Sequence, residues 1–438
     1  MSGLIWNKTK ECMDPEDRYK LQSARLVKQV KRVYHQVPFY REKMQERGLE
    51  PGDIRGLEDL EKLPFTTKTD LRDNYPFGLF AVPQSEIIRL HASSGTTGKP
   101  TVVGYTRRDI ACWQECVARC LTMAGVTTHD KVQVSYGYGL FTGGLGLHYG
   151  VENMGAMVIP ISTSRTRKQL QLMEDFGTTV IACTPSYLAH LMDGIIENNI
   201  KDRLKLHIAI CGAEPWTDEL RQKIQDGLGI DLFDIYGLSE IMGPGVAQDC
   251  PYHNGGHIQD DYFLPEILAP DSDEVLEDGE TGELVITTLT KEALPLIRYR
   301  THDLTSLSHE RCDCGRTSAR IARFRGRSDD MLIIRGVNVF PSQIEAALMQ
   351  LGESKPHYQI ILDRKNNMDT FDILLEVEDR FFSDEVAKLE QLTRKVTRIL
   401  AQALGLNPHV QLVEPNTIER STDGKAHRVI DRRNLYKS

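Results

Sequence analysis

A loop rich in glycine and hydroxyl residues runs from His91 to Thr106 with the sequence HASSGTTGKPTVVGYT. Glycine allows the backbone to approach a ligand closely, hydroxyl and amide groups bind phosphate oxygens, and a lysine supplies positive charge. The loop does not fit the usual P-loop pattern, because only two residues separate Gly95 from Gly98 and Pro100 follows the lysine. It is predicted either to bind a phosphate-bearing anion or to form a polar turn between strands, and the residues concerned are Ser93, Ser94, Gly95, Thr96, Thr97, Gly98 and Lys99.

Two acidic side chains could bind parts of a nucleotide. Glu240, in YGLSE, offers the hard oxygen atoms that Mg²⁺ prefers. Asp303, in YRTHD, can accept hydrogen bonds from two adjacent ribose hydroxyls. Taken alone, Glu240 could equally be a solvated residue near a helix N-cap, and Asp303 could form an ion pair with Arg298 or Arg300. Other motifs in the chain are needed to distinguish nucleotide binding from these structural roles.

The segment SYGYGLFTGGLGLHYG combines aromatic rings with six glycines. Rings such as those of Tyr136 and Phe141 can stack on a flat ligand, and the glycines leave space for it. The segment therefore predicts a pocket for an aryl group. The alternative is an aromatic core strand followed by a glycine-rich turn.

Three cysteines and a histidine could form a metal site. Cys250 lies near His253 and His257, while Cys312 and Cys314 follow some 60 residues later. Three thiolates and an imidazole suit tetrahedral Zn²⁺, and either histidine could complete the set. The alternative is a group of free thiols near a loop histidine.

Short β-branched runs alternate with helical patterns through the middle of the chain. This alternation predicts parallel βαβ units, with the site at the carboxyl ends of the strands. The expected strands lie in KVQVSYG, AMVIPIS, TTVIACTPS and LHIAICGAE, with helices over 167–176 and 187–198 and an amphipathic N-terminal helix over 17–47.

The pattern changes after Glu274, where Asp278-Gly279 and Thr281-Gly282 indicate tight turns of a β-hairpin or small barrel. After the charged break RFRGRSDD, about 110 residues alternate strand, helix, strand and helix. We therefore expect an α/β protein with a large N-terminal domain, residues 1–328, that includes a small β-barrel-like part. A small mobile α+β domain, residues 329–438, follows it.

Composition limits the classes of partner. The chain has 438 residues, 40% of them hydrophobic, and a formal net charge of -9, which does not favour binding to nucleic acid or to an anionic membrane. The N-terminus lacks the apolar run of a signal peptide, and nine cysteines without an export signal suggest reduced thiols. We expect a cytosolic protein, and the charged amphipathic N-terminal helix is compatible with a homodimer.

Five motifs occur in the order used by adenylate-forming acyl-CoA synthetases, and the chain resembles that superfamily over nearly its whole length. The compact length, the aromatic-glycine segment and the run DDMLIIRGVNVFPSQIE resemble the phenylacetate-CoA ligase family within it. The five ordered motifs are SSGTTGKP, YGLSE, YRTHD, GRSDD and the Gly424-Lys425 pair.

The resemblance implies roles for individual residues. Lys425 and Glu240 would be catalytic, with Mg²⁺ at Glu240, and Asp329 would be the hinge of the small domain. ATP would contact the glycine-rich loop together with Glu214, Tyr236, Gly237, Ser239, Asp303 and Arg327. The acid pocket would add Gly212, Ala213 and Pro244 to Tyr136 and Phe141, and coenzyme A would meet Arg335, Gly336 and Val337.

The implied activity is ATP-dependent ligation of an aryl-acetic acid, first of all phenylacetate, to coenzyme A through an acyl-adenylate. The implied cofactors are ATP, Mg²⁺, coenzyme A as co-substrate, and a structural Zn²⁺ at Cys250, His257, Cys312 and Cys314. Two alternatives stay open: an adenylyltransferase that stops at the AMP adduct, and a non-catalytic nucleotide-binding regulator. The second is disfavoured because Glu240, Asp303 and Lys425 are all present.

Overall fold

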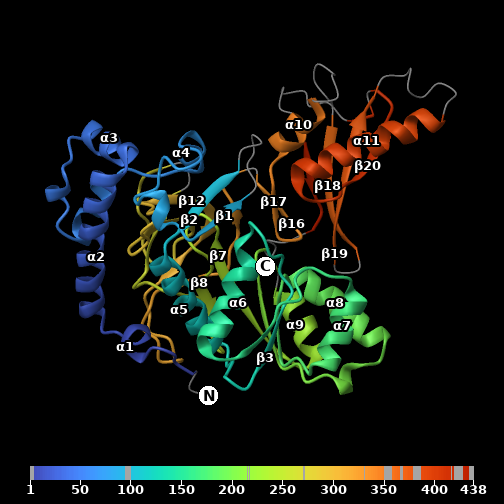
Figure 1. The fold of residues 1–438 in the computed structure, drawn as a ribbon, viewed down its shortest axis with the longest axis horizontal. Coiled ribbons are helices and arrows are strands. Elements are labelled where there is room, and N and C mark those ends of the chain that lie inside the picture. Colours follow the sequence, from blue (N-terminus) through green and yellow to red (C-terminus); the bar gives the residue numbers. More distant parts are fainter. Residues whose placement is uncertain are drawn as a thin grey trace.

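The computed structural model describes residues 4–93, 100–214, 216, 218–269, 272–329, 331–349, 358–365, 368–377, 386–415, 417–418 and 428–433. The N-terminal part is helical and lies along one side of the molecule, drawn in blue in Figure 1. Its elements are α1 (Lys8–Glu11), α2 (Pro15–Gln36), α3 (Pro38–Glu46), the 3-10 turns Pro51–Asp53 and Leu57–Lys62, α4 (Lys68–Asp73) and a further 3-10 turn, Gln84–Glu86.

The single N-terminal helix expected over 17–47 is divided into α2 and α3. Pro38 cannot continue α2, since it lacks an N–H and restricts the residue before it, and it begins α3 instead. The apolar face of α2 is buried within the chain, where Gln22 and Gln29 donate hydrogen bonds to the carbonyls of Asp260 and Lys291 at 2.7 and 2.6 Å. Because this face is already covered, it gives no support to a dimer.

A nine-stranded mixed sheet forms the centre of the molecule in the order β13-β14-β9-β8-β7-β6-β5-β3-β4. Strands β3 to β7 pair in parallel and the others pair antiparallel, as expected for βαβ units extended by hairpins. The strands are β3 (Lys131–Val134), β4 (Met157–Ile159), β5 (Val180–Cys183), β6 (Ile208–Gly212), β7 (Asp231–Leu238), β8 (Gly243–Asp249), β9 (Gly256–Ile258), β13 (Leu307–Ser308) and β14 (Arg320–Ile321).

The strand pleat distributes the buried side chains between two cores. Along β5, Val180 and Ala182 belong to the large core, whereas Ile181 and Cys183 belong to a second core that includes side chains of α7, α8 and α9. Helices α5 and α6 contribute to the large core, so the two groups of helices cover opposite faces of the sheet. These helices are α5 (Arg107–Met123), α6 (Thr142–Met154), α7 (Thr166–Asp175), α8 (Pro185–Glu197), the 3-10 turn Lys201–Arg203, and α9 (Asp218–Leu228).

The part expected to resemble a barrel is an open four-stranded antiparallel sheet of order β10-β11-β12-β15. Its strands are β10 (Phe263–Leu268), β11 (Gly282–Thr288), β12 (Tyr299–Thr305) and β15 (Gly326–Arg327). It does not close among the described residues, since β15 has only two residues and its pairing is with β12. The expected turn at Asp278-Gly279 lies in the connection between β10 and β11, where Val275 makes an isolated bridge to Leu268.

The C-terminal part has its own core and follows the expected order of strands and helices. A hairpin leads into a four-stranded sheet of order β20-β19-β18-β21, and α10 and α11 pack against each other. The predicted boundary near 329 lies between Ile321, in the large core, and Ile334, in this one. The elements are β16 (Leu332–Ile334), β17 (Val337–Val339), α10 (Pro341–Met349), β18 (Tyr358–Lys365), β19 (Met368–Glu376), α11 (Val386–Leu404), β20 (His409–Val413) and β21 (Val429–Asp431).

A two-stranded sheet, β1 (Arg89–Ser93) and β2 (Thr101–Tyr105), flanks the glycine-rich loop. Residues 94–99 of that loop lie outside the described residues. In the parts of the chain that the structure describes, no helix is long and apolar enough to cross a bilayer.

Candidate active site

Two cavities meet at the carboxyl ends of the parallel strands, between the large core and the hairpin β16–β17. The first is lined by the end of β7, the start of α6, residues 323–327 and residues of the hairpin. The second reaches the first turns of α8 and the same hairpin. Both include Tyr136, Phe141, Ala213, Ser239 and Gly336, so the two cavities adjoin each other.

Glu240 follows β7 in the chain and lies beside Ser93, the last residue of β1, where the glycine-rich loop begins. The Ser93 hydroxyl donates to Glu240 Oε1 at 2.9 Å, and Glu240 itself is 4% exposed. The Lys68 ammonium lies 3.7 Å from the same oxygen, although no sequence motif had singled it out. The structure therefore brings together the loop, the acidic residue and a cation from α4.

Glu240 fits the expected magnesium ion by its chemistry. Its carboxylate supplies hard oxygens, its recorded contacts are made through Oε1, and it lines the first cavity beside Ser239. The Ser239 hydroxyl lies 3.1 Å from the hydroxyl of Thr142. A cation at Glu240 would thus lie next to hydroxyl groups suited to phosphate oxygens.

Asp303 is held by Tyr236 and Arg327, and not by the arginines nearest to it in sequence. The Tyr236 hydroxyl donates to Asp303 Oδ2 at 2.8 Å, and the Arg327 guanidinium donates to Oδ1. Arg298 and Arg300 instead pair with glutamates of neighbouring strands. Burial raises the pKa of Asp303, although the charge of Arg327 opposes the effect.

Arg327 also connects this carboxylate to the expected hinge. Its Nε and Nη2 atoms donate to the two oxygens of Asp329 at 2.8 and 3.0 Å. Burial opposes ionisation of Asp329, but the hydrogen bonds it accepts and the positive charge of Arg327 together outweigh burial and lower the pKa of the carboxyl. Tyr236, Asp303, Arg327 and the predicted hinge residue Asp329 thus form one chain of hydrogen bonds.

The aromatic segment lines both cavities, but its tyrosine hydroxyl faces the protein. Tyr136 donates to the carbonyls of Cys183 and Gly212 at 2.6 and 3.2 Å, so its ring and not its hydroxyl is available to a ligand. Gly212 does not line either cavity. A Cβ at this position would lie 2.1 Å from the carbonyl oxygen of Ile235, so glycine is needed there for close strand packing.

Glu214, Ala213, Gly237 and Pro244 line the first cavity. The Ser186 hydroxyl donates to Glu214 Oε1 at 2.7 Å, while Oε2 accepts no hydrogen bond in the described structure. Burial raises the pKa of Glu214. An enclosed carboxyl oxygen without a donor is suited to bind a polar group of a ligand.

The first turn of the C-terminal part reaches the second cavity through Arg335, Gly336 and Val337. Gly336 has a φ of +76°, and a Cβ there would lie 3.0 Å from the Thr184 methyl group. The Arg335 guanidinium donates to the carbonyl of Asp369 at 2.6 and 2.8 Å. Lys425, expected to be catalytic, lies outside the described residues.

The sequence analysis also missed several residues that line the first cavity, among them Phe324, Trp216 and Asp234. Phe324 packs against Tyr236 with ring centroids 4.5 Å apart, and Trp216 and Asp234 line the same cavity. Burial, with the nearby Asp249 carboxylate, raises the pKa of Asp234 to about 6. A period-two reading of β7 places Asp234 on the same face as Tyr236, which was the available signal.

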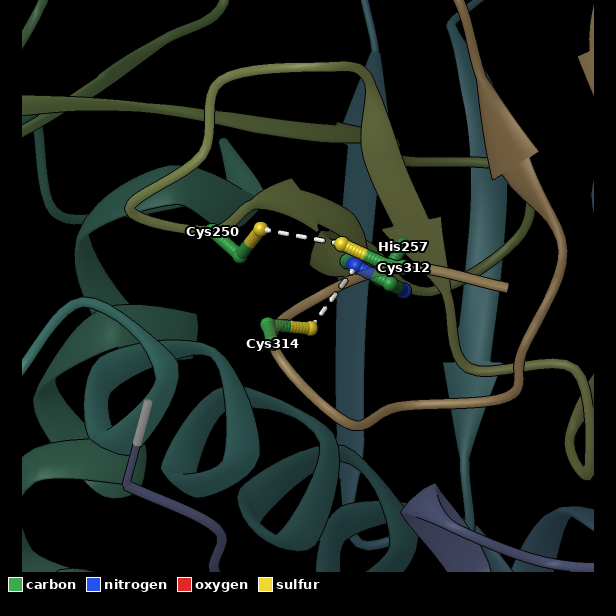
Figure 2. Close-up of side chains that lie close together, drawn as sticks. All are labelled: Cys250, His257, Cys312 and Cys314. Carbon is green, nitrogen blue, oxygen red and sulfur yellow. Dashed lines mark hydrogen bonds between the residues drawn. The ribbon is translucent and has the colours of Figure 1, made fainter. Parts of the chain in front are cut away.

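Cys250, His257, Cys312 and Cys314 form a buried cluster whose ligand atoms all lie within 4.8 Å of one another. Figure 2 shows the three sulfur atoms and the imidazole converging on one point. The sulfur atoms of Cys250 and Cys312 are 3.7 Å apart, and Cys314 Sγ is 3.3 Å from His257 Nε2. Tetrahedral Zn–S bonds of about 2.3 Å place ligand atoms about 3.8 Å apart.

His257, and not His253, belongs to this cluster. His257 Nδ1 lies 3.2 Å from the Ser318 hydroxyl, which leaves Nε2 facing the thiols. His253 Nδ1 instead lies 2.9 Å from Asp249 Oδ2. Hydrogen bonding from the Cys250 thiol and from His257 lowers the pKa of Cys314, so the cluster contains a group suited to metal ligation.

The fold and the site define the class of adenylate-forming enzymes. Residues 23–290 match the family described as AMP-binding enzyme, and residues 336–433 match the family described as AMP-binding enzyme C-terminal domain. A phenylacetate-coenzyme A ligase of Thermus thermophilus is 48% identical over 98% of this chain and 100% of its own length. Its counterpart in Pseudomonas putida is 50% identical over 94% of this chain and 93% of its own length. The chain belongs to the phenylacetate-CoA ligase family of AMP-binding enzymes.

A solved relative occurs in more than one arrangement. A 2-hydroxyisobutyryl-CoA ligase with its acyl-adenylate and CoA, in the thioesterification state, aligns with a TM-score of 0.92 and 29% identity. The alignment covers 99% of this chain and 93% of that one. The same ligase in the postadenylation state covers the same shares with a TM-score of 0.72.

Proposed function

We propose that this protein is an ATP-dependent ligase that joins an aryl-acetic acid, first of all phenylacetate, to coenzyme A and releases AMP and pyrophosphate. The observation that carries the proposal is the meeting of Glu240, Asp303 and the Gly336 turn around two adjoining cavities. Relatives that cover nearly the whole chain at 48% to 50% identity are phenylacetate-coenzyme A ligases.

In the first half-reaction, an oxygen of the acid would attack the α-phosphorus of ATP, and the bond from that phosphorus to pyrophosphate would break. Asp303 would accept hydrogen bonds from the ribose hydroxyls, while Tyr236 and Arg327 hold its carboxylate in place. Glu240 and the hydroxyl of Ser239 would hold Mg²⁺ and the phosphates, and the ion would offset their charge. Lys425 would stabilise charge near the α-phosphate.

In the second half-reaction, the sulfur of coenzyme A would attack the acyl carbon, its proton would be lost to solvent, and AMP would leave. The similarity to the thioesterification state, with a TM-score of 0.92 against 0.72, supports an arrangement ready for this step. Arg335, Gly336 and Val337 then line the route of the thiol. We take residues 1–328 and 329–438 as the two moving bodies, with the hinge at Asp329.

The second cavity favours an aryl acid because Tyr136 and Phe141 lie beside Gly137 and Ala213, which are small. The test is pyrophosphate release with ATP and a panel of phenylacetate, hydroxyphenylacetate, indoleacetate, benzoate and acetate. The proposal expects the highest kcat/KM for an aryl-acetic acid. Equal rates with acetate would contradict the aryl assignment, and no release with any acid would support a non-catalytic regulator.

We also propose that Cys250, His257, Cys312 and Cys314 bind one structural Zn²⁺. The ligand set and its spacing support zinc, and the cluster shares no residue with either cavity. Metal analysis of protein purified without added zinc should find about one ion per chain. A metal content near zero, with the three cysteine thiols free to react with a thiol reagent, would contradict the proposal.

A further inference from the structure

One ammonium group contacts both a carboxylate of the active site and a ring of the C-terminal part. Lys68 Nζ lies 3.7 Å from Glu240 Oε1 and 4.8 Å from the centre of the Phe340 ring. The side chains of Lys68 and Glu240 are only 11% and 5% exposed. A cation so enclosed interacts strongly with both groups, because water does not screen them.

Lys68 and Phe340 belong to different parts of the chain. Thr66 N–H donates to the Arg298 carbonyl at 3.1 Å and its carbonyl accepts from Arg300 N–H at 2.9 Å, which fixes this segment beside β12. Phe340 lies beyond the expected hinge, where Gln343 Oε1 accepts its N–H at 3.0 Å at the start of α10. A movement of the C-terminal part would remove the ring and leave the lysine in place.

Charge balance predicts in which step of the reaction Lys68 pairs with Glu240. In the described part of the chain, Lys68 is the one cation recorded within ion-pair distance of Glu240. During adenylation the same carboxylate would bind Mg²⁺, and two cations at one carboxylate oxygen repel each other. Once pyrophosphate and the ion have left, the buried carboxylate needs another positive charge.

We infer that Lys68 is a positioning residue that neutralises Glu240 after pyrophosphate release and, through Phe340, stabilises the thioester-forming arrangement. The inference rests on the proposed function. It gives a role to Lys68, the first residue of α4. The ion pair and the ring contact together favour one arrangement of the C-terminal part in the absence of Mg²⁺ and pyrophosphate.

The first test measures thioester formation from supplied phenylacetyl-adenylate and coenzyme A. Phe340→Leu removes the ring face and keeps an apolar side chain, and Lys68→Met removes the charge; each should slow this step about tenfold. The double variant should be no slower than the slower single variant, because both changes break one linkage. Phe39→Leu is the matched control, since Phe39 makes a similar contact with Lys43, 4.7 Å away, remote from Glu240.

The second readout is amide hydrogen exchange of residues 335–339 in the complex with a non-reactive acyl-adenylate analogue. Faster exchange in Lys68→Met and Phe340→Leu, and unchanged exchange in Phe39→Leu, is expected. Lys68→Arg should retain slow exchange, and this also shows that the fold tolerates change at the site. Unchanged exchange and unchanged thioester formation in both variants would overturn the inference. Failure of the unaltered protein to form the thioester would instead overturn the proposed function.

Discussion

The orientation of the Asp303 carboxylate is fixed by the side chains around it. Its two oxygens are held by a tyrosine hydroxyl and a guanidinium from different strands, so its orientation is set before a ligand arrives. The arginines beside it in sequence point to Glu266 and Glu283. Preorganised acceptors of this kind bind two adjacent hydroxyls without further rearrangement.

Tyr236→Phe should raise the KM for ATP about tenfold while leaving kcat within a few-fold. The change removes one donor from an enclosed carboxylate, which typically weakens an interaction by about 1 to 2 kcal/mol. Pyrophosphate release at varied ATP concentration measures it. Tyr34→Phe, which removes a hydroxyl remote from the cavities, is the control. An unchanged KM in Tyr236→Phe would argue against Asp303 as the ribose acceptor.

Asp234→Asn should stabilise the protein more at neutral pH than in acid. Burial raises the pKa of Asp234 from 3.8 to about 6, so the folded state holds the proton more tightly and stability is lost as pH rises across this interval. The difference in free energy of unfolding between the variant and the unaltered protein should grow by at most ~3 kcal/mol between about pH 4 and pH 7. The value is an upper limit because the Asp234 side chain lines a cavity that water can enter. Urea unfolding at several pH values measures it. A constant difference across that range would show that the pKa of Asp234 is not raised.

At the scale of elements, the CxC segment organises the N-terminal end of the chain. Arg316, two residues after Cys314, donates to Glu11 Oε2 at 2.7 Å and to the Leu4 carbonyl at 2.6 Å. Thr317 N–H donates to the Glu11 carbonyl at 3.0 Å. The cluster of Cys250, His257, Cys312 and Cys314 is therefore placed to fix the loop that holds α1.

Zinc removal should loosen this segment before it affects the active site. Treatment with a chelator, or Cys314→Ser, should increase amide exchange of residues 4–18 about tenfold or more, because the loop that binds them loses its anchor. Cys12→Ser, a change at a nearby cysteine outside the cluster, should not do so. If exchange in residues 4–18 is the same with and without metal, the cluster does not perform this structural role.

Patterns within one element were predictable from the sequence, whereas contacts between distant elements were not. The strands β3, β5 and β6, the helices α7 and α8 and the order of the C-terminal elements follow from local periodicity and turn residues. Pro38 divided a helix whose apolar pattern continued across it. Lys68 and Phe324 could not be identified, because each is an ordinary residue until the fold places it beside Glu240 or Tyr236.

At the scale of the whole molecule, the two half-reactions need the C-terminal part in two arrangements. Gly336 touches the wall of the second cavity, while Lys425 is separated from it by some 90 residues and belongs to the other half-reaction in our account. The higher similarity to a relative in the thioesterification state agrees with this division. Rotation about a hinge can exchange the two groups at one site.

Gly336→Val and Lys425→Ala should therefore affect opposite half-reactions. A side chain at Gly336 would meet the Thr184 methyl group at 3.0 Å and would strain a φ of +76°, so thioester formation should fall about a hundredfold with adenylation little changed. Lys425→Ala should show the reverse pattern. Quenched single-turnover assays of each step measure both, and equal losses in both steps for both variants would contradict two arrangements.

The most direct test of the account is the stoichiometry of one reaction with phenylacetate, ATP and coenzyme A. The account predicts that phenylacetyl-CoA, AMP and pyrophosphate form in equal amounts and that AMP release depends on coenzyme A, because the thiol is what displaces AMP from the adenylate. AMP release at the same rate without coenzyme A, or an AMP adduct as the final product, would contradict the ligase assignment.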